Sequence, residues 1–487
     1  MPSTYKTPGV YVEEIAKFPP SVAQVETAIP AFIGYTERAE LNGRSFANVP
    51  VRITSLVDYT LIFGGPFNEN AGLGAITLVG TAPALALSVG PTAPTIVYRM
   101  FYSLQLYFAN GGGPCYIISV GTYTADPVAT PPEIDHTLLI GGLDPLAKED
   151  EPTLILFPDA VAIADPANFH SVYQQALIQC ADLQDRFTIC DVYDGDTDFS
   201  APGGPDVIND AGGFRSGIGN NNLTYGAAYY PWLTTTLTPA IDEATLEVEV
   251  PVPDPPPDPL PDPFVLNDPA NEATSLFHLQ NDVYHQIKNA IAEFNIVLPP
   301  SCILAGVYAR VDSTRGVWKA PANVSVSGIV DPTVVLDDAD QEGLNVHVSG
   351  KSINAIRRFT GKGILVWGAR TLAGNDNEWR YVPVRRFFIM VEESVKKATE
   401  PFVFEPNDAN TWAKVKAMIE NFLLLQWRAG ALAGAKPEDA FFVKVGLGET
   451  MTSLDILEGR LIVEIGMAAV RPAEFIVLRF SHKLQES

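Results

Sequence analysis

The chain has 487 residues, of which 47% are hydrophobic and 18% are charged, a composition typical of folded globular domains. Its 32 Lys and Arg against 57 Asp and Glu give a formal net charge of −25, which argues against nucleic-acid binding by phosphate neutralisation and against an anionic membrane surface as partner. Residues 1–287 hold 9 basic and 34 acidic residues, whereas residues 288–487 hold 23 of each. We expect the acidic part to face solvent and the charge-balanced part to pack against other protein.

Residues 1–20 are expected to form a detached strand arm. The segment 9–15 has the β-branched and aromatic content of a strand, and Pro19-Pro20 follow it closely. A single strand followed by two prolines does not fold back as a hairpin, so it needs the edge of another sheet. A second strand is predicted at 28–36.

Helices and apolar strands alternate in the next part of the chain. This alternation indicates an α/β domain around a partly parallel sheet. The predicted helices cover 98–110 and 169–183, and the predicted strands cover 115–120, 153–157 and 186–192.

Residues 251–263 hold eight prolines and three aspartates, typical of a stiff, acidic surface loop. The loop is interpreted as a spacer, with a docking ligand as the alternative. Beyond it we predict three amphipathic helices and then two strands separated by Arg471-Pro472. The helices cover 276–294, 384–399 and 409–427, and the strands cover 461–468 and 474–481.

The residues give no support for catalysis or metal binding. Gly350-Lys351-Ser352 matches the end of a P-loop, but residue 345 is Asn where the first glycine is required. His278 and His285 could share a helix face, without a carboxylate or cysteine at ligand spacing. Acidic clusters at 194–198 and 337–340 are interpreted as solvated loops, because the first lacks the glutamate that a calcium loop requires.

The cysteines and the apolar stretches bear on the compartment. Four cysteines without a CxxC pair (Cys115, Cys180, Cys190 and Cys302) are typical of buried thiols in a reducing compartment. The N-terminus has no apolar signal region, and the uncharged stretch 70–98 is interrupted by prolines and glycines. We therefore expect a soluble product of the cytoplasm with no signal peptide and no direct membrane insertion.

Several blocks of the sequence resemble contractile tail sheath proteins. They include YKTPGVYVEEI at 5–15, GVYARVDSTRGVWKAPAN at 306–323, VWGARTL at 366–372 and WRAGALAG at 427–434, with shorter matches at 25–28, 31–34, 379–382 and 385–386. The N-terminal block is most similar to sheaths of phage-tail-like extracellular injection systems. The tail of a true virion is the second interpretation, and a type VI secretion sheath, built from two smaller chains, fits poorly.

The resemblance implies a structural subunit, not an enzyme. Such subunits polymerise as stacked hexameric rings around an inner tube and contract to drive the tube through a target cell envelope, without hydrolysing nucleotide. The implied partners are further copies of the chain, the inner tube protein, and baseplate and terminal cap proteins, with no cofactor and no nucleic acid. The implied place is a phage-tail-like particle made in the bacterial cytoplasm, which can be released outside the cell.

The expected fold is a multidomain α/β or α+β chain. An inner domain is built from the N- and C-terminal parts, an outer domain is inserted, and strand arms extend from both termini. The expected divisions are an N-terminal arm (1–20), a first core part (21–120), a variable outer insertion with the proline-rich loop (121–275), a second core part (276–360), a tube-facing C-terminal domain (361–470) and a C-terminal arm (471–487).

Donated strands are the expected link between subunits, because an exposed strand edge pairs with another strand through main-chain hydrogen bonds. Arms of two copies are expected to add to an acceptor strand of a third. The N-terminal arm comprises Val10, Tyr11, Val12, Glu13, Glu14 and Ile15, and the C-terminal arm Phe475, Ile476, Val477, Leu478, Arg479 and Phe480. The acceptor strand comprises Leu461, Ile462, Val463, Glu464 and Ile465, and the hinges Pro19, Pro20, Arg471 and Pro472.

Two further interpretations stay open at this point. Lys414 and Lys416 are expected to face the tube, with a merely solvated helix face as the alternative. A capsid-type shell protein would share the arms and the missing chemistry, and the range 121–275 alone could be a binding module for carbohydrate or protein.

Overall fold

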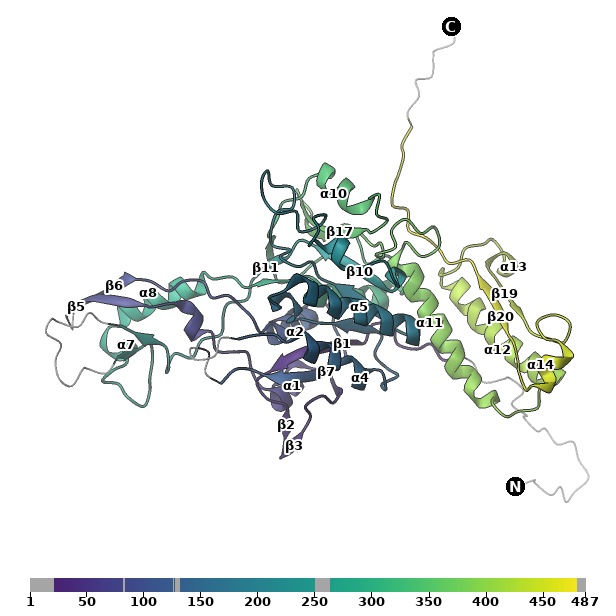
Figure 1. The fold of residues 1–487 in the computed structure, drawn as a ribbon, viewed down its shortest axis with the longest axis horizontal. Coiled ribbons are helices and arrows are strands. Elements are labelled where there is room, and N and C mark those ends of the chain that lie inside the picture. The colour runs from purple at the N-terminus through teal and green to yellow at the C-terminus, as the bar shows by residue number, and fades with distance from the viewer. Residues whose placement is uncertain (1–21, 82–83, 126, 128–131, 250–262, 480–487) are drawn as a thin grey trace, which may run out of the picture. The chain divides into compact units, whose positions relative to one another are not determined.

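The computed structural model describes residues 22–81, 84–125, 127, 132–249 and 263–479 (Figure 1). The chain divides into a small unit, residues 1–25 and 390–470, and a large unit, residues 26–389 and 471–487. The predicted N-terminal arm Val10–Ile15, the hinge Pro19-Pro20 and Phe480 lie outside the described residues.

A nine-stranded mixed sheet forms the centre of the large unit, with strand order β15-β18-β17-β10-β9-β8-β1-β7-β4. Its six middle strands, from β17 to β7, run parallel, and the outer strands run antiparallel to their neighbours. The partly parallel sheet predicted from the sequence is confirmed. In chain order the strands are β1 (Pro30–Thr36), β4 (Val51–Ile53), β7 (Cys115–Thr122), β8 (Leu154–Leu156), β9 (Phe187–Cys190), β10 (Gly226–Tyr230), β15 (Val324–Ser325), β17 (Ile353–Phe359) and β18 (Gly363–Val366).

Helices cover both faces of this sheet, which explains why its middle strands are mainly apolar. In β1, Ala31 and Ile33 enter the core on one face, and Phe32 enters the core on the other. The first face is covered by α3 (His136–Gly141), α4 (Leu143–Leu146) and α5 (Pro166–Leu183). The second is covered by α1 (Leu56–Phe63), α2 (Met100–Ala109) and α9 (Ser301–Arg315).

The helix predictions are confirmed except at one place. The four predicted at 98–110, 169–183, 384–399 and 409–427 are α2, α5, α11 (Val382–Thr399) and α12 (Ala409–Arg428). The single helix predicted over 276–294 is wrong, because the chain leaves helical geometry at Gln280 (φ −146°, ψ 71°) between α7 (Leu276–Leu279) and α8 (Asn281–Ala292). The break lets Leu276 and Val283 enter the same apolar cluster while Leu279 is exposed.

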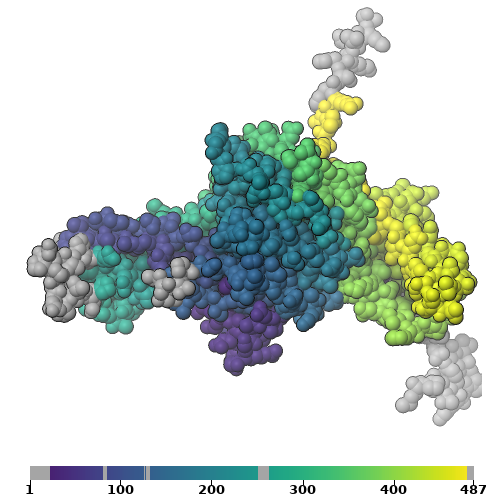
Figure 2. Space-filling view, in the orientation of Figure 1, coloured from purple at the N-terminus to yellow at the C-terminus, as the bar shows by residue number. Residues whose placement is uncertain are grey.

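This apolar cluster, here called the satellite cluster, joins two segments that are distant in the sequence. The hairpin β5 (Thr77–Thr81) and β6 (Ala84–Val89) packs against α8, and Leu78 and Leu85 share the cluster with Leu266 and Ile287. The two segments, coloured blue and teal, lie side by side in the surface view (Figure 2). The pair β12 (Glu247–Val248) and β13 (Phe264–Val265) belongs to the same cluster and brackets the proline-rich segment.

The range 121–275, expected as one insertion, therefore does not fold as one body. Residues 154–230 supply β8, β9 and β10 to the middle of the central sheet. Leu246, Val248 and Leu266 belong to the satellite cluster together with Leu73 and Leu85. The physical reason is that segments distant in the sequence pair to complete both the central sheet and the satellite cluster. A change of composition along the chain does not indicate such pairing.

The small unit contains the second half of α11, α12 and a two-stranded ribbon. The ribbon consists of β19 (Phe441–Lys444) and β20 (Glu464–Met467), with α13 (Pro437–Ala440) and α14 (Ser453–Leu457) beside it in the sequence. The strand predicted at 461–468 is thus shorter, and residues 474–479 of the strand predicted at 474–481 lie in no strand. Among the helices that the structure describes, none is long and apolar enough to cross a membrane.

Candidate contact surfaces

The ribbon of the small unit presents an unpaired strand edge. β19 and β20 form a two-stranded sheet that no other described strand joins. The Ala468 N–H donates to the Ala440 carbonyl (N···O 2.9 Å), so by antiparallel alternation the main-chain groups of Gly466 also face β19. Those of Ile465 then point to the opposite edge. That edge offers a row of donors and acceptors that can receive another strand.

The side chains of the ribbon are also incompletely covered. No residue of β20 is fully buried: Glu464 is exposed, and Ile465, Gly466 and Met467 are half-buried. Of the predicted acceptor residues, only Glu464 and Ile465 lie in β20, while Leu461, Ile462 and Val463 directly precede it. The ribbon is supported by α12, which packs against β19, so β20 is its less covered strand.

Large apolar side chains are exposed elsewhere in the small unit. Single exposed apolar residues are ordinary, but a concentration of them marks a contact surface. The exposed set comprises Val403, Phe404, Leu425, Phe442, Leu447, Leu454, Leu457 and Ile462.

The two candidate tube-facing lysines lie on α12. The Asp408 side chain caps this helix by accepting from the Asn410 and Thr411 N–H groups. Val415 and Ile419 are buried on the inner side, whereas Lys414 is exposed and Lys416 is half-buried. Lys414 is therefore the better placed of the two for contact with another molecule.

The C-terminal arm is held at one residue of the large unit and is exposed beyond it. The Glu474 carboxylate forms an ion pair with Arg370 (Nη2···Oε2 2.7 Å). The next four residues, Phe475 to Leu478, are 70–79% exposed. Four consecutive exposed apolar side chains form a second candidate contact surface. At the proposed hinge, Arg471 is exposed and Pro472 is half-buried, in a stretch with no helix or strand.

A buried ion pair holds Thr27, near the N-terminal end of the large unit, in place. Arg386 Nη2 lies 2.5 Å from Asp312 Oδ2, with the two side chains only 3% and 6% exposed. The Thr27 hydroxyl donates to Asp312 (2.6 Å), and Arg386 donates to the Thr27 carbonyl (2.8 Å). The Arg386 guanidinium also lies 4.6 Å from the centre of the Tyr308 ring. These contacts satisfy the buried charges and fix the chain just before β1.

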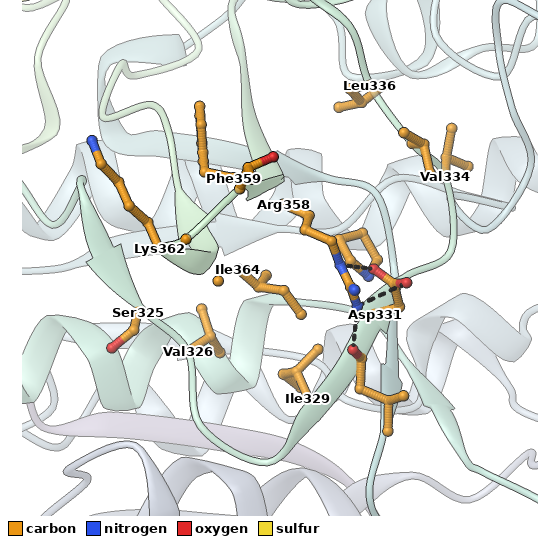
Figure 3. A pocket seen from close by; sticks show the side chains of 16 residues that line it. Ser325, Val326, Ile329, Asp331, Val334, Leu336, Arg358, Phe359, Lys362 and Ile364 are labelled. Carbon is orange, nitrogen blue, oxygen red and sulfur yellow. Dashed lines mark hydrogen bonds and ion pairs between the residues drawn. The ribbon is translucent and has the colours of Figure 1, made fainter.

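A hollow of about 710 Å³ lies between β16 (Ile329–Pro332) and the β17–β18 hairpin (Figure 3). Apolar side chains including Ile329 and Ile364 line it, and its one acid, Asp331, is paired with Arg358 (Nη2···Oδ2 2.9 Å). No His, Cys or second carboxylate occurs among its described lining residues. The described lining therefore combines apolar side chains with one ion pair.

The structure places the residues of the motifs that suggested chemistry in different surroundings. Lys351 of the P-loop-like tripeptide is buried and its ammonium donates to the Arg215 carbonyl. His278 and His285 lie on the separate helices α7 and α8 and are both exposed. Burial raises the pKa of the Cys115 thiol far above its ordinary value, and the three other cysteines are also buried.

Comparison with known proteins identifies the family of the chain. The family model of the phage tail sheath protein central domain matches residues 184–372, and that of the phage tail sheath C-terminal domain matches residues 374–483. A chain of the anti-feeding prophage (AFP) helical sheath in its contracted state is 32% identical, covering 99% of this chain and 100% of its own length, with a TM-score of 0.62. The chain belongs to the phage tail sheath family. This sheath protein is accordingly a structural protein and not an enzyme.

Two further solved relatives match the sheath protein over its whole length. A chain in the AFP baseplate structure is 32% identical over 99% of the sheath protein and 100% of that chain, with a TM-score of 0.62. A chain of the PVC sheath, an extracellular contractile injection system, is 29% identical over 99% of both chains, with a TM-score of 0.61.

Curated phage relatives match over shorter segments. The tail sheath protein of Burkholderia phage BcepMu is 29% identical over 143 residues, which are 28% of this chain and 30% of that protein. The tail sheath protein of Enterobacteria phage T4 is 22% identical over 131 residues, 27% of this chain and 20% of that protein. The matched segments thus span less than a third of these curated relatives.

Sequence reasoning missed the two carboxylate–arginine contacts. Glu474 and Arg370 are 104 residues apart, and Asp312 and Arg386 are 74 apart. No local periodicity or motif signals such pairs, although Arg370 and Arg386 both lie in blocks that resemble the family.

Proposed function

We propose that the sheath protein polymerises as stacked hexameric rings around an inner tube, and that contraction of the stack drives the tube through a target cell envelope. The observation that carries this proposal is that one chain has both an exposed apolar arm, 475–478, and an unpaired strand edge at β20. Donor and acceptor are different surfaces, so contact between copies is heterologous. Repeated heterologous contacts generate rings or helical stacks.

Strand donation is the proposed link between copies. The N-terminal arm Val10–Ile15 of one copy and the C-terminal arm Phe475–Phe480 of another add to the Leu461–Ile465 region of a third. Main-chain pairing is retained during large rigid-body movements if the connections to the arms bend. Pro19-Pro20 and Arg471-Pro472 are the proposed bending points.

New contact between subunits is the proposed driving force for contraction. A gain of only ~200 Å² of apolar burial per subunit would contribute about 5 kcal/mol at ~25 cal/mol per Å². The extended sheath would then be kinetically trapped. A contracted sheath that unfolds no less readily than the extended one would contradict this part of the proposal.

The proposed partners are further copies of the chain, the inner tube protein, the baseplate and the terminal cap proteins. The AFP chains that match this protein occur in a baseplate and in a helical sheath, which supports the first and third of these. Exposed Lys414 is the proposed tube contact, with Lys416 beside it, and a merely solvated face is the alternative.

An extracellular injection system is the proposed setting, and the tail of a true virion is the second candidate. The full-length similarity to AFP and PVC chains, against matches to less than a third of the curated phage proteins, favours the first.

Electron microscopy of the chain, alone and co-expressed with tube and baseplate proteins, tests the proposal. We expect sixfold hollow tubes that are lost on deletion of residues 1–20 and on Val477→Asp, which charges the apolar arm. The matched control is Val348→Asp, because Val348 is equally apolar, 96% exposed and outside both contact surfaces. Closed shells, or tubes unaffected by both arm variants, would contradict the proposed linkage.

A further inference from the structure

The C-terminal segment of the large unit depends on side chains for its position. The Val470 N–H donates to the Ala431 carbonyl (3.1 Å), the last antiparallel pairing in the small unit. Residues 471–479 belong to no helix or strand. A segment without main-chain pairing stays ordered only where its side chains are held.

Glu474 is the residue that is held. Its carboxylate accepts from Arg370 Nε (2.9 Å) and Nη2 (2.7 Å), from Asn345 Nδ2 (2.7 Å) and from the Tyr381 hydroxyl (3.1 Å). The Arg370 side chain is 4% exposed and that of Glu474 is 21% exposed. This carboxylate is largely buried and accepts hydrogen bonds from one charged and two neutral side chains, so it has one well-defined position.

Arg370 is also held in place by residues other than Glu474. Its Nη1 donates to the carbonyls of Asn345 (3.3 Å) and Gly374 (3.2 Å). Its main-chain N–H donates to the side chain of Asn354 in β17 (2.7 Å). The guanidinium is therefore positioned by residues other than Glu474, and it binds the Glu474 carboxylate.

Exposure changes abruptly at this residue. Glu474 lies in the wall of a hollow that Tyr381, Phe475 and Ile476 also line. The side chain of Glu474 is 21% exposed, whereas Phe475, Ile476, Val477 and Leu478 are each at least 70% exposed. Exposure therefore rises sharply directly after Glu474.

We infer that Glu474 is the anchor that fixes where the C-terminal arm leaves the subunit, so that the segment received by a second copy of the chain begins at Phe475. This inference rests on the proposed strand donation and deepens it. Glu474 is a positioning residue, because it acts through the direction and reach of the arm. The arm itself then bends beyond Glu474, and the proposed bending point Arg471-Pro472 lies in the sequence between the small unit and the anchor.

A spin-label distance measurement tests the anchor in the dispersed chain. Nitroxides are placed at Val348→Cys and Phe475→Cys, both exposed positions, while the four native cysteines are buried. We expect a narrow distance distribution that broadens on Glu474→Ala and, less, on Glu474→Gln. Glu438→Ala, which removes an exposed carboxylate on α13, is the matched control and leaves the distribution narrow.

Polymerisation with tube and baseplate proteins gives the second readout. Loss of charge-assisted hydrogen bonds at Glu474 should raise the concentration needed for polymerisation about 10- to 100-fold, with thermal unfolding of the variant checked against wild type. Glu474→Asp should recover part of the loss.

The outcomes separate this inference from the proposed function. The anchor would be overturned if the wild type forms tubes and Glu474→Ala leaves the label distances unchanged. It would also be overturned if Glu474→Ala polymerises as the wild type does. Failure of the wild type to polymerise with its partners would contradict the proposed function, while the distance distributions would still decide whether Glu474 holds the arm.

Discussion

The central sheet of the large unit and the ribbon of the small unit differ in how much of each is completed by its own chain. The sheet has nine strands and apolar cores on both faces, with side chains such as Phe32 and Ile155 fully buried. The ribbon has two strands, and β20 contains no fully buried residue. The first region is thus completed by its own chain, whereas the second leaves an edge and side chains accessible, as the proposed contact with another copy requires.

Removal of one outward N–H from the ribbon should have the largest effect on assembly. Ile465→Pro deletes a donor at the unpaired edge of β20 and none of the hydrogen bonds to β19, because the Ile465 N–H points away from β19. Proline is tolerated at such a strand edge. We expect complete loss of tubes by electron microscopy, with thermal unfolding of the dispersed chain nearly unchanged.

Gly466→Pro is the contrasting variant for that prediction. It deletes the N–H that faces β19 and so should destabilise the small unit itself. If Ile465→Pro still forms tubes, the outer edge of β20 does not receive a donated strand.

In the large unit, the largest effect on stability is expected at the buried ion pair. Arg386→Ala leaves Asp312 buried without its partner, which should lower the free energy of unfolding by about 3–5 kcal/mol in urea titration. Arg358→Ala breaks a pair whose side chains are 55% and 43% exposed, and about 0–1 kcal/mol is expected. Equal losses of unfolding free energy in the two variants would contradict the distinction between the buried and the exposed ion pair.

A smaller, pH-dependent effect is expected at Glu69. Burial raises the pKa of this carboxyl to about 8, and the charge of Arg99 offsets the shift only in part. Glu69 is then protonated in the folded chain at neutral pH but ionised in the unfolded chain. Stability should therefore fall as pH rises from 4.5, the ordinary value, to about 8, at a slope of about 1.4 kcal/mol per pH unit.

The window for measuring Glu69 is pH 6 to 8. Burial also raises the pKa values of Asp159 and Asp191, each to about 6, so these groups contribute the same sign at lower pH. Subtracting the Glu69→Gln profile from that of wild type isolates Glu69. Parallel profiles between pH 6 and 8 would show that Glu69 is already ionised when folded.

The smallest effect is expected at the Glu474 anchor in acid. Burial works against the ionised carboxylate, but hydrogen bonds from Arg370, Asn345 and Tyr381 outweigh it and lower the pKa of Glu474. The contribution of the anchor is thus complete above the ordinary pKa of 4.5 and is lost as pH falls through the lowered value. In acid, the distance distribution between the labels at positions 348 and 475 should broaden for the wild type. The distribution of Glu474→Gln is already broader and should not change further in acid.

The elements of the central sheet could be predicted because local pattern and burial agree there. α5 begins with Asp165 as its cap and Pro166 in its first turn, and β1 is continuously apolar. The strand expected at 474–481 rested on the same apolar pattern, but its described part has no strand to pair with in a single chain. The apolar pattern was therefore wrong about the local structure of residues 474–479, and their role as a contact segment stays a prediction.

Long-range pairing could not be predicted from the sequence. The satellite cluster joins Leu78 to Ile287, and the Glu474 anchor joins the chain end to Arg370. Such contacts depend on the path of the chain between them, which propensity and spacing do not contain. The acceptor residues Leu461–Ile465 were inferred from apolar content, and only the pairing with β19 identifies which edge of the strand is unpaired.

The most direct test of strand donation is a disulfide between copies. Chains carrying Val463→Cys alone and Leu478→Cys alone are mixed, polymerised with tube and baseplate proteins and oxidised, so that any disulfide between the two kinds of chain joins different copies, since the native cysteines are buried. The account predicts a product of twice the chain mass in tubes and none in the dispersed mixture. Tubes visible by electron microscopy without this product would contradict pairing of the C-terminal arm with the β20 region.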